Sequence, residues 1–239
     1  MSWLTLVRHA QASFHADHYD QLSPLGERQS RVLGAAWVRQ QRTFDEVYVG
    51  PRARQRQTAE IVAASYAQAG WPFPQPVVLA ELDEYDLGGI LHSLAPALAR
   101  QDAAFARLLE LQRHGTTDRD RERSFQAMFE PLLRHWQSAD SAADGLESWP
   151  AFGGRVARGL AQITQRPGQG RRVAAFTSGG FIGTALQHVL AAPAAAALEI
   201  NWRIRNASLT EFVFSGERLT LDSFNSVAHF EEPELLTFR

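Results

Sequence analysis

The pair Arg8-His9 comes directly after the apolar run Trp3–Val7. Such a run predicts a short buried strand, and its abrupt end would place a guanidinium beside an imidazole at the strand tip. A guanidinium matches phosphate oxygens with paired hydrogen bonds, and a neutral imidazole nitrogen is a nucleophile that can form a covalent intermediate. The pair therefore predicts a phosphoryl-binding site at the end of the first strand.

Other polar clusters stand in comparable positions. The acidic segment Glu81–Glu84 follows one apolar run, Thr177–Gly180 follows the run Val173–Phe176, and Arg54 comes shortly after Glu46–Val49. In an open α/β sheet, ligands bind beyond the carboxyl ends of the strands, so we expect these clusters to converge on the first strand tip. The hydroxyl of Ser178 and the main-chain N–H groups of Gly179 and Gly180, where a helix begins, would favour an anion there.

The composition excludes several kinds of catalytic and metal site. All 24 basic residues are arginine, and the sequence of 239 residues contains no cysteine. A Walker A lysine, a lysine Schiff base, a cysteine nucleophile and a zinc-thiolate site are thereby excluded. An anion site in this chain must use arginine forks, main-chain N–H groups or histidines. The net charge of -2 gives no sign of nucleic-acid binding.

Strand and helix patterns alternate along the chain. Ser23 is the predicted cap of a first helix that starts at Pro24. The alternation predicts an α/β fold with three layers, a doubly wound, mostly parallel sheet and an antiparallel edge. Besides the runs named above, we expect a short strand at Val77–Leu79 and a hairpin formed by Ser208–Phe214 and Leu219–Phe224.

The stretch from about 91 to 149 differs in character and predicts a helical cap inserted into this one domain. It contains two apolar stripes at helical spacing, which we interpret as packing faces. The charged run 119–123 between them indicates a solvated face or loop. A cap that follows Glu84 directly would lie over the strand ends and set substrate choice.

Five segments resemble motifs of the histidine phosphatase (phosphoglycerate mutase-like) superfamily, in family order and over most of the chain. The resemblance begins with Leu-Val-Arg-His-Ala, which is similar to Leu-Val-Arg-His-Gly. The segment 50–59 is similar to Ser-Pro-Leu-x-Arg-Ala-x-Gln-Thr-Ala. The remaining matches are residues 22–29 with Leu-Thr-x-x-Gly-x-x-Gln, residues 82–89 with the acid segment, and residues 225–229 with Asn-x-x-x-His.

The resemblance implies a role for each matched residue. His9 would attack phosphorus and become a phosphohistidine, while Arg8 and Arg54 hold the phosphoryl oxygens. Glu84 would protonate the leaving oxygen and then activate water. The scheme requires no metal or other cofactor. The family alignment selects Glu84, whereas the residues alone leave Glu81, Asp83 and Glu84 open, with strand alternation placing Glu84 opposite the other two.

Two departures stand beside this resemblance. Ser178 occupies the position of the family's second histidine, and Ala10 replaces the usual glycine after His9. A serine offers a neutral hydroxyl where a histidine could be a cationic donor, and the loss of one such donor costs about a hundred- to a thousand-fold in rate. Ser178 and Gly179 would still bind phosphate. We therefore expect a slow or specialised phosphatase.

Three other interpretations remain open at this stage. The chain could bind a phosphorylated ligand without turnover, or it could be a phosphotransferase of the mutase type. A metal site at His15–Asp20 has suitable residue types but no partner elsewhere in the sequence.

His229 is expected to be structural. Arg52 and Arg56, which flank Arg54, are expected to face solvent or pair with acids.

The expected setting is the cytoplasm. No run of about twenty apolar residues is present, and the first residues lack a secretory pattern. The expected partner is a phosphorylated substrate, and we expect this substrate to be a small molecule. No membrane partner is expected. A homodimer is compatible with the sequence, but oligomeric state cannot be read from it.

Overall fold

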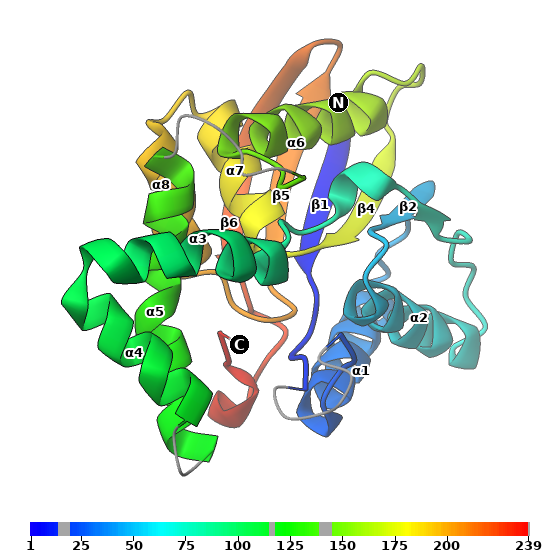
Figure 1. Ribbon diagram of the computed structural model, residues 1–239. Coiled ribbons are helices and arrows are strands. Elements are labelled where there is room, and N and C mark those ends of the chain that lie inside the picture. Colours follow the sequence, from blue (N-terminus) through cyan, green and yellow to red (C-terminus); the bar gives the residue numbers. More distant parts are fainter. Residues whose placement is uncertain (14–19, 115–117, 139–144, 239) are drawn as a thin grey trace. The chain divides into compact units, whose positions relative to one another are not determined.

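A six-stranded sheet forms the core of the first of two compact units (Figure 1). The computed structural model describes residues 1–13, 20–114, 118–138 and 145–238. The strand order is β3-β2-β4-β1-β5-β6, in which β1, β2, β3 and β4 run parallel and β5 and β6 form the antiparallel edge. This confirms the predicted fold class. The strands are β1 (Ser2–Arg8), β2 (Glu46–Val49), β3 (Val77–Val78), β4 (Arg172–Thr177), β5 (Leu209–Ser215) and β6 (Arg218–Ser226).

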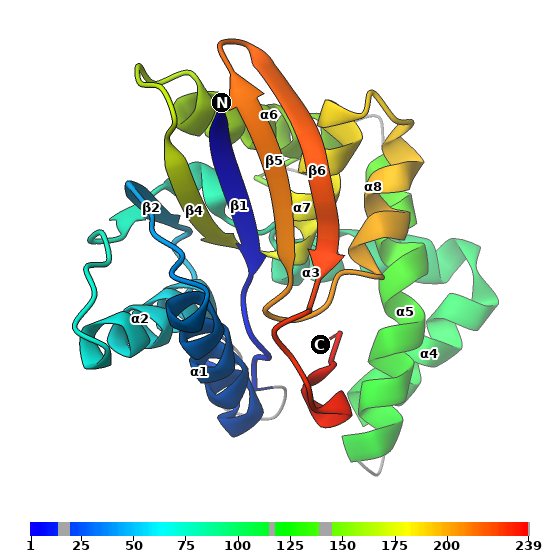
Figure 2. The same cartoon turned by 180° about the vertical axis from the view of Figure 1, so that it is seen from behind.

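Helices cover both faces of this sheet. The first unit comprises Met1–Glu84 and Arg155–Arg239. Leu33 and Trp37 of α1 (Pro24–Arg39), with Val62 of α2 (Ala53–Gln68), join the apolar cluster on one face. On the other face lie α7 (Gly179–Val189) and the later turns of α6 (Trp149–Thr164), as Figures 1 and 2 show from opposite sides.

The start of α1 follows the sequence signals closely. Ser23 caps the helix by accepting a hydrogen bond of 3.0 Å from the N–H of Gly26. Gly26 also lets the helix approach the segment after β1, since a Cβ atom there would lie 2.0 Å from the carbonyl oxygen of Gln11. The predicted cap is confirmed, and the helix is fixed against the chain that continues from His9.

The second compact unit is helical and spans Tyr85–Gly154. It contains α3 (Leu87–Gln101), α4 (Ala103–His114), α5 (Asp118–Ser138) and the first turns of α6. Tyr85, Trp136, Trp149 and Phe152 stack against one another with ring centroids 5.1–6.0 Å apart. The charged run 119–123, predicted as a solvated face or loop, lies within α5. That this unit caps the strand ends stays a prediction.

The structure differs from the sequence analysis at two places, the end of the strand predicted at Val77–Leu79 and a helix for which no prediction was made. The acidic segment is not a strand, because the short 3-10 helix η1 (Ala80–Leu82) replaces it and β3 ends at Val78. Helix α8 (Ala194–Asn201) was not predicted, because its run of alanines shows no apolar period. A second 3-10 helix, η2, spans Pro233–Leu235. Within the described part of the chain, no helix combines the length and the apolar character needed to cross a membrane.

Candidate active site

The carboxyl ends of three parallel strands bring the candidate residues together. The N–H of His9, just after β1, donates to the carbonyl of Thr177 at the end of β4 over 2.8 Å. The N–H of Gly50, just after β2, donates to the carbonyl of Phe176 over 3.0 Å. Each of these strands leads into a candidate segment, so the main chain alone places His9, Arg54 and Ser178 on adjacent tips.

The imidazole of His9 is buried and held at both nitrogens. Its Nδ1 atom lies 2.7 Å from the carbonyl oxygen of Ala10, and Nε of Arg54 donates to its Nε2 atom over 3.1 Å. Since Arg54 can only donate there, Nε2 must carry the lone pair and Nδ1 the proton. The main chain therefore holds the imidazole in the tautomer in which Nε2 carries the lone pair.

The surroundings also hold this imidazole neutral. Burial, followed by the positive charges of Arg54 and Arg8, keeps the pKa of His9 well below its ordinary value of 6.5. The hydrogen bond to Ala10 acts in the opposite direction and does not outweigh them. A neutral imidazole between two guanidinium groups is a nucleophile in a site suited to an anion.

The two predicted clamp arginines have different contacts. Arg54, buried at the start of α2, reaches His9 with Nε and the carboxylate of Asp20 with Nη1. Arg8 lies at the end of β1 and donates from Nη1 to the carbonyl of Ile204. Both cations act on His9 electrostatically, so the structure brings the predicted arginines to the imidazole.

The structure separates the three candidate acids. Glu81 accepts a hydrogen bond from Gln162 on α6, and Asp83 pairs with Arg52 at 2.5 Å. Oε2 of Glu84 instead accepts a hydrogen bond of 3.0 Å from the N–H of Gly180, at the start of α7. Glu84 is thus the member of the three whose carboxylate contacts the segment Ser178–Gly180.

Ser178 is completely buried and is bound by a residue that the sequence analysis did not single out. Nε2 of Gln55 donates to Oγ of Ser178 over 2.8 Å and contacts the carbonyl of Leu82 at 3.2 Å. Oε1 of the same amide accepts from the N–H of Arg52 at 3.0 Å. Gln55 therefore ties together the segments that carry Arg54, Glu84 and Ser178.

Gly179 lies where the main chain must come close to its neighbours. A Cβ atom at this position would lie 2.3 Å from Oδ1 of Asn201 and 3.6 Å from Nε of Arg8. The absence of a side chain thus lets the start of α7 approach Arg8 and α8 together. The predicted phosphate-binding residues Arg8 and Gly179 are neighbours.

Other residues at the site were missed because their types are ordinary. Arg155 donates to the carbonyls of Glu81, Asp83 and Glu84 at 2.7–3.4 Å and so holds the acid segment. Gln55 had one usable signal, since it stands at the alanine of the matched motif while Ser178 stands at the histidine. Nothing in the sequence connects Arg155 to the site, and Asp20 was considered only as part of the possible metal site His15–Asp20.

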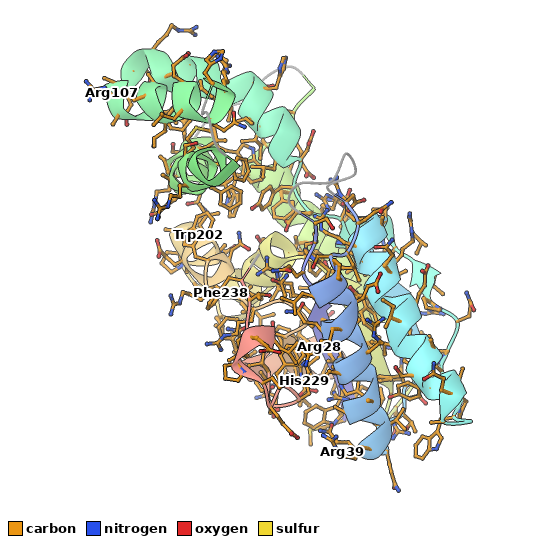
Figure 3. The ribbon with its side chains drawn as sticks, turned by 90° about the horizontal axis from the view of Figure 1, so that it is seen from below. Arg28, Arg39, Arg107, Trp202, His229 and Phe238 are labelled. Atoms are coloured by element: carbon orange, nitrogen blue, oxygen red, sulfur yellow. The ribbon has the colours of Figure 1, made fainter. Side chains whose placement is uncertain are left out.

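The remaining predictions have separate outcomes. Arg52 pairs with Asp83, and Arg56 is exposed, as expected. For the proposed metal site, residues 15–19 lie outside the described ranges. Among the described residues, no group of three or more potential metal ligands occurs. His229 is buried on the C-terminal segment, which ion pairs from Arg28 attach to α1 (Figure 3).

Three solved structures illustrate what the chain is similar to in fold. A putative alpha-ribazole-5'-P phosphatase from Escherichia coli aligns with a TM-score of 0.62 and 18% identity, covering 95% of this chain and 98% of the other. Phosphoserine phosphatase from Entamoeba histolytica aligns with a TM-score of 0.62 and 18% identity, covering 96% of this chain and 99% of the other. Phosphoglycerate mutase from Bacillus anthracis aligns with a TM-score of 0.62 and 16% identity, covering 95% of this chain and 94% of the other. At these identities the alignments show the fold alone.

The family is established from the sequence itself. No curated protein matches the chain. The family model described as histidine phosphatase superfamily (branch 1) matches residues 4–110 and 113–227, which is nearly the whole chain. These ranges include the predicted site residues His9, Arg54, Glu84 and Ser178. The chain belongs to the histidine phosphatase superfamily.

Proposed function

We propose that this protein hydrolyses phosphomonoesters through a phosphohistidine on His9. The observation that carries the proposal is the state of that imidazole: its pKa is lowered so that it is neutral, its Nδ1 proton is held by Ala10, and its Nε2 lone pair accepts a hydrogen bond from Arg54. When an entering phosphoryl group takes Arg54 as its own partner, the lone pair becomes free to attack phosphorus. Membership of the superfamily and the phosphatases among the solved structures of this fold support the assignment.

The first half of the reaction transfers the phosphoryl group to His9. Nε2 gives its lone pair to phosphorus while the bond between phosphorus and the leaving oxygen breaks. Arg8 and Arg54 stabilise the oxygens of the transferring group, where negative charge is concentrated. Glu84 gives its proton to the leaving oxygen, so the alcohol departs neutral. No metal or other cofactor takes part in this scheme.

The second half returns the enzyme to its starting state. Glu84, now a carboxylate, takes a proton from water as the water oxygen attacks phosphorus. The bond between phosphorus and Nε2 breaks, and its electron pair returns to the imidazole. The N–H of Gly180, at the start of α7, donates to Oε2 of Glu84 and holds this side chain in place for both proton transfers.

Ser178 limits the rate in this proposal. Its hydroxyl oxygen accepts a hydrogen bond from Gln55. The hydroxyl has a single proton, so Ser178 can offer at most one neutral O–H donor to the phosphoryl group. We therefore propose slow or specialised turnover of small phosphorylated molecules. In the same proposal, the helical unit Tyr85–Gly154 caps the strand ends and sets substrate choice.

The test compares hydrolysis by the wild type and by His9→Ala, using p-nitrophenyl phosphate and a panel of small phosphomonoesters. We expect phosphate release by the wild type and loss of at least a thousand-fold in the variant, roughly the effect of removing a nucleophile. Mass spectrometry after an acid-free quench should find one phosphoryl group on His9. Equal rates for the two proteins would reject catalysis by His9.

A second function is favoured by one specific feature. Ser178, completely buried and bound by Gln55, stands at the position of the family's second histidine, which suits a protein that binds a phosphorylated ligand and does not cleave it. Stoichiometric binding with neither phosphoenzyme nor released phosphate would identify that function. A mutase-type phosphotransferase would instead return the phosphoryl group to an acceptor other than water.

A further inference from the structure

Asp20 lies at the candidate site, although the proposed reaction gives it no role. Its Oδ1 atom is 2.7 Å from Nη1 of Arg54, and its Oδ2 atom accepts a hydrogen bond of 2.7 Å from the main-chain N–H of Ala53. Arg54 simultaneously donates from Nε to Nε2 of His9. One buried guanidinium therefore joins the candidate nucleophile to a carboxylate that is held at both of its oxygens.

The donors that hold Asp20 are those that a phosphoryl group needs. Arg54 offers guanidinium N–H groups that match phosphate oxygens. Ala53 is the first residue of α2, where main-chain N–H groups have no partner within the helix and favour negative charge. Since Nε of Arg54 is 3.1 Å from Nε2 of His9, a phosphoryl group that approaches this nitrogen also approaches Arg54. Its oxygens and the carboxylate then require the same guanidinium.

We propose that Asp20 is an internal competitor for Arg54 that lowers the affinity of the site for phosphoryl dianions. In the free protein the carboxylate neutralises Arg54, and it gives up the guanidinium when phosphate binds. The inference rests on the proposed function in one respect, namely that phosphate binds at His9 and Arg54.

The competition lowers the affinity for substrate and for product by the same factor, because both present a phosphoryl group to Arg54. A phosphomonoester keeps further contacts through its leaving group, whereas inorganic phosphate has only those of the phosphoryl group and becomes a weak ligand. Asp20 therefore favours release of inorganic phosphate. The partial exposure of its side chain, 40%, leaves room for it to leave Arg54 for water.

The opposite role for Asp20 makes the opposite prediction. If the carboxylate served to orient Arg54 toward His9, its removal would weaken phosphate binding and lower kcat. If it competes, its removal strengthens phosphate binding and lowers KM while kcat changes little. Inorganic phosphate binding therefore separates the two roles directly.

The experiment measures the Kd of inorganic phosphate by calorimetry and its inhibition of p-nitrophenyl phosphate hydrolysis, in the wild type, Asp20→Asn and Asp20→Ala. We expect phosphate to bind both variants about tenfold more tightly, the effect of freeing one charge-assisted hydrogen bond. Asp45→Asn is the matched control, because Asp45 accepts from the N–H of Arg172 at the opposite end of the sheet. It removes the same charge and should leave phosphate affinity unchanged.

Equal or weaker phosphate binding in both Asp20 variants would overturn the inference. If hydrolysis still depends on His9 in that case, the competitor role alone fails and the proposed function stands. If phosphate binds none of the proteins and hydrolysis does not depend on His9, the proposed function fails, and the inference fails with it.

Discussion

At the scale of single residues, the protonation state of His9 is the property on which the site depends. Burial and the charges of Arg54 and Arg8 hold its pKa well below 6.5, so the imidazole stays neutral at pH values where an ordinary histidine is protonated. We therefore expect loss of kcat/KM from protonation of His9 to begin well below pH 6.5. A profile of kcat/KM from pH 4 to pH 8, paired with NMR titration of histidine ring carbons, measures this.

The NMR resonance of His9 is assigned from its disappearance in His9→Ala. It should titrate well below pH 6.5, the ordinary value for a histidine side chain. Titration at or above that value would contradict the charge state on which the proposed mechanism rests.

The residues of this site were predictable where a motif carries them and not elsewhere. Arg8, His9 and Arg54 follow strand ends or begin a helix, so the topology of a parallel sheet brings them together. Glu84 required the family alignment, because Glu81 and Asp83 have the same chemistry and nearly the same position. Asp20 is recognised only by the distance between its carboxylate and Arg54, which no local pattern contains.

At the scale of elements, Gln55 connects the start of α2 with the acid segment and the start of α7. Its buried amide hydrogen-bonds to Arg52, Leu82 and Ser178. Gln55→Ala should lower the free energy of unfolding by about 3 kcal/mol, because the N–H of Arg52 and the hydroxyl of Ser178 lose a partner and the carbonyl of Leu82 keeps only Thr177. Urea unfolding measures the loss, and kcat/KM should fall as well, since the connected segments carry Arg54 and Glu84.

Two further variants sharpen this prediction. Gln55→Glu keeps the size of the side chain but places an oxygen against the carbonyl of Leu82, so it should be at least as damaging as alanine. Gln187→Ala removes a half-buried side-chain amide that donates a hydrogen bond to the carbonyl of Ala192. This variant should lower the free energy of unfolding by less than about 1 kcal/mol. Similar losses for Gln55→Ala and Gln187→Ala would show that Gln55 does not connect the segments energetically.

Close packing of α7 on α8 supplies another prediction at this scale. A Cβ atom on Gly183 would lie 2.5 Å from the carbonyl oxygen of Ala197, which belongs to the main chain of α8 and cannot rotate away. Gly183→Ala should therefore destabilise the protein by about 1–3 kcal/mol. Gly153→Ala on α6 meets no atom within 4 Å and should be neutral or stabilising. Equal shifts in Tm would contradict the close approach.

Helices and strands with a clear hydrophobic period or a helix-capping residue were predicted from the sequence. Elements whose conformation depends on tertiary contacts were not. The strands β1, β2 and β4 and the start of α1 at Ser23 match the expectation. Helix α8 has no polar face to create a period, and only packing against α7 reveals why it is a helix. The acid segment forms η1 because Arg155 and Thr177 bind its carbonyls, which no sequence window contains.

At the scale of the whole molecule, buried histidines should make the stability of the protein depend on pH. His229 is nearly inaccessible, and its ring packs on Phe230 with centroids 4.1 Å apart. Burial lowers its pKa from 6.5 to about 4, against a smaller opposing effect of a hydrogen bond to the main chain of Ala207. The folded protein therefore prefers the neutral imidazole, while the unfolded chain takes up a proton near pH 6.5.

The sign of the effect follows from these two values. Above pH 6.5 both states hold His229 neutral and the stabilising contribution is complete. Between pH 6.5 and about pH 4 the unfolded chain binds the proton first, so stability falls as pH falls. Below pH 4 no further loss from this group occurs. The full difference in pKa corresponds to about 3 kcal/mol of unfolding free energy.

A variant that cannot titrate isolates this contribution from those of the carboxylates and of His9. His229→Gln should be less stable than the wild type at pH 7.5, because it loses packing on Phe230, but its free energy of unfolding should change less between pH 7.5 and pH 4.5. Urea unfolding at both pH values gives the four free energies needed. His9→Ala provides the comparison, since His9 is also buried and neutral and its removal should reduce the pH dependence in the same direction. If wild type and His229→Gln lose the same stability on acidification, the proton that unfolds this protein binds elsewhere, and the C-terminal segment around His229 tolerates a charged imidazole.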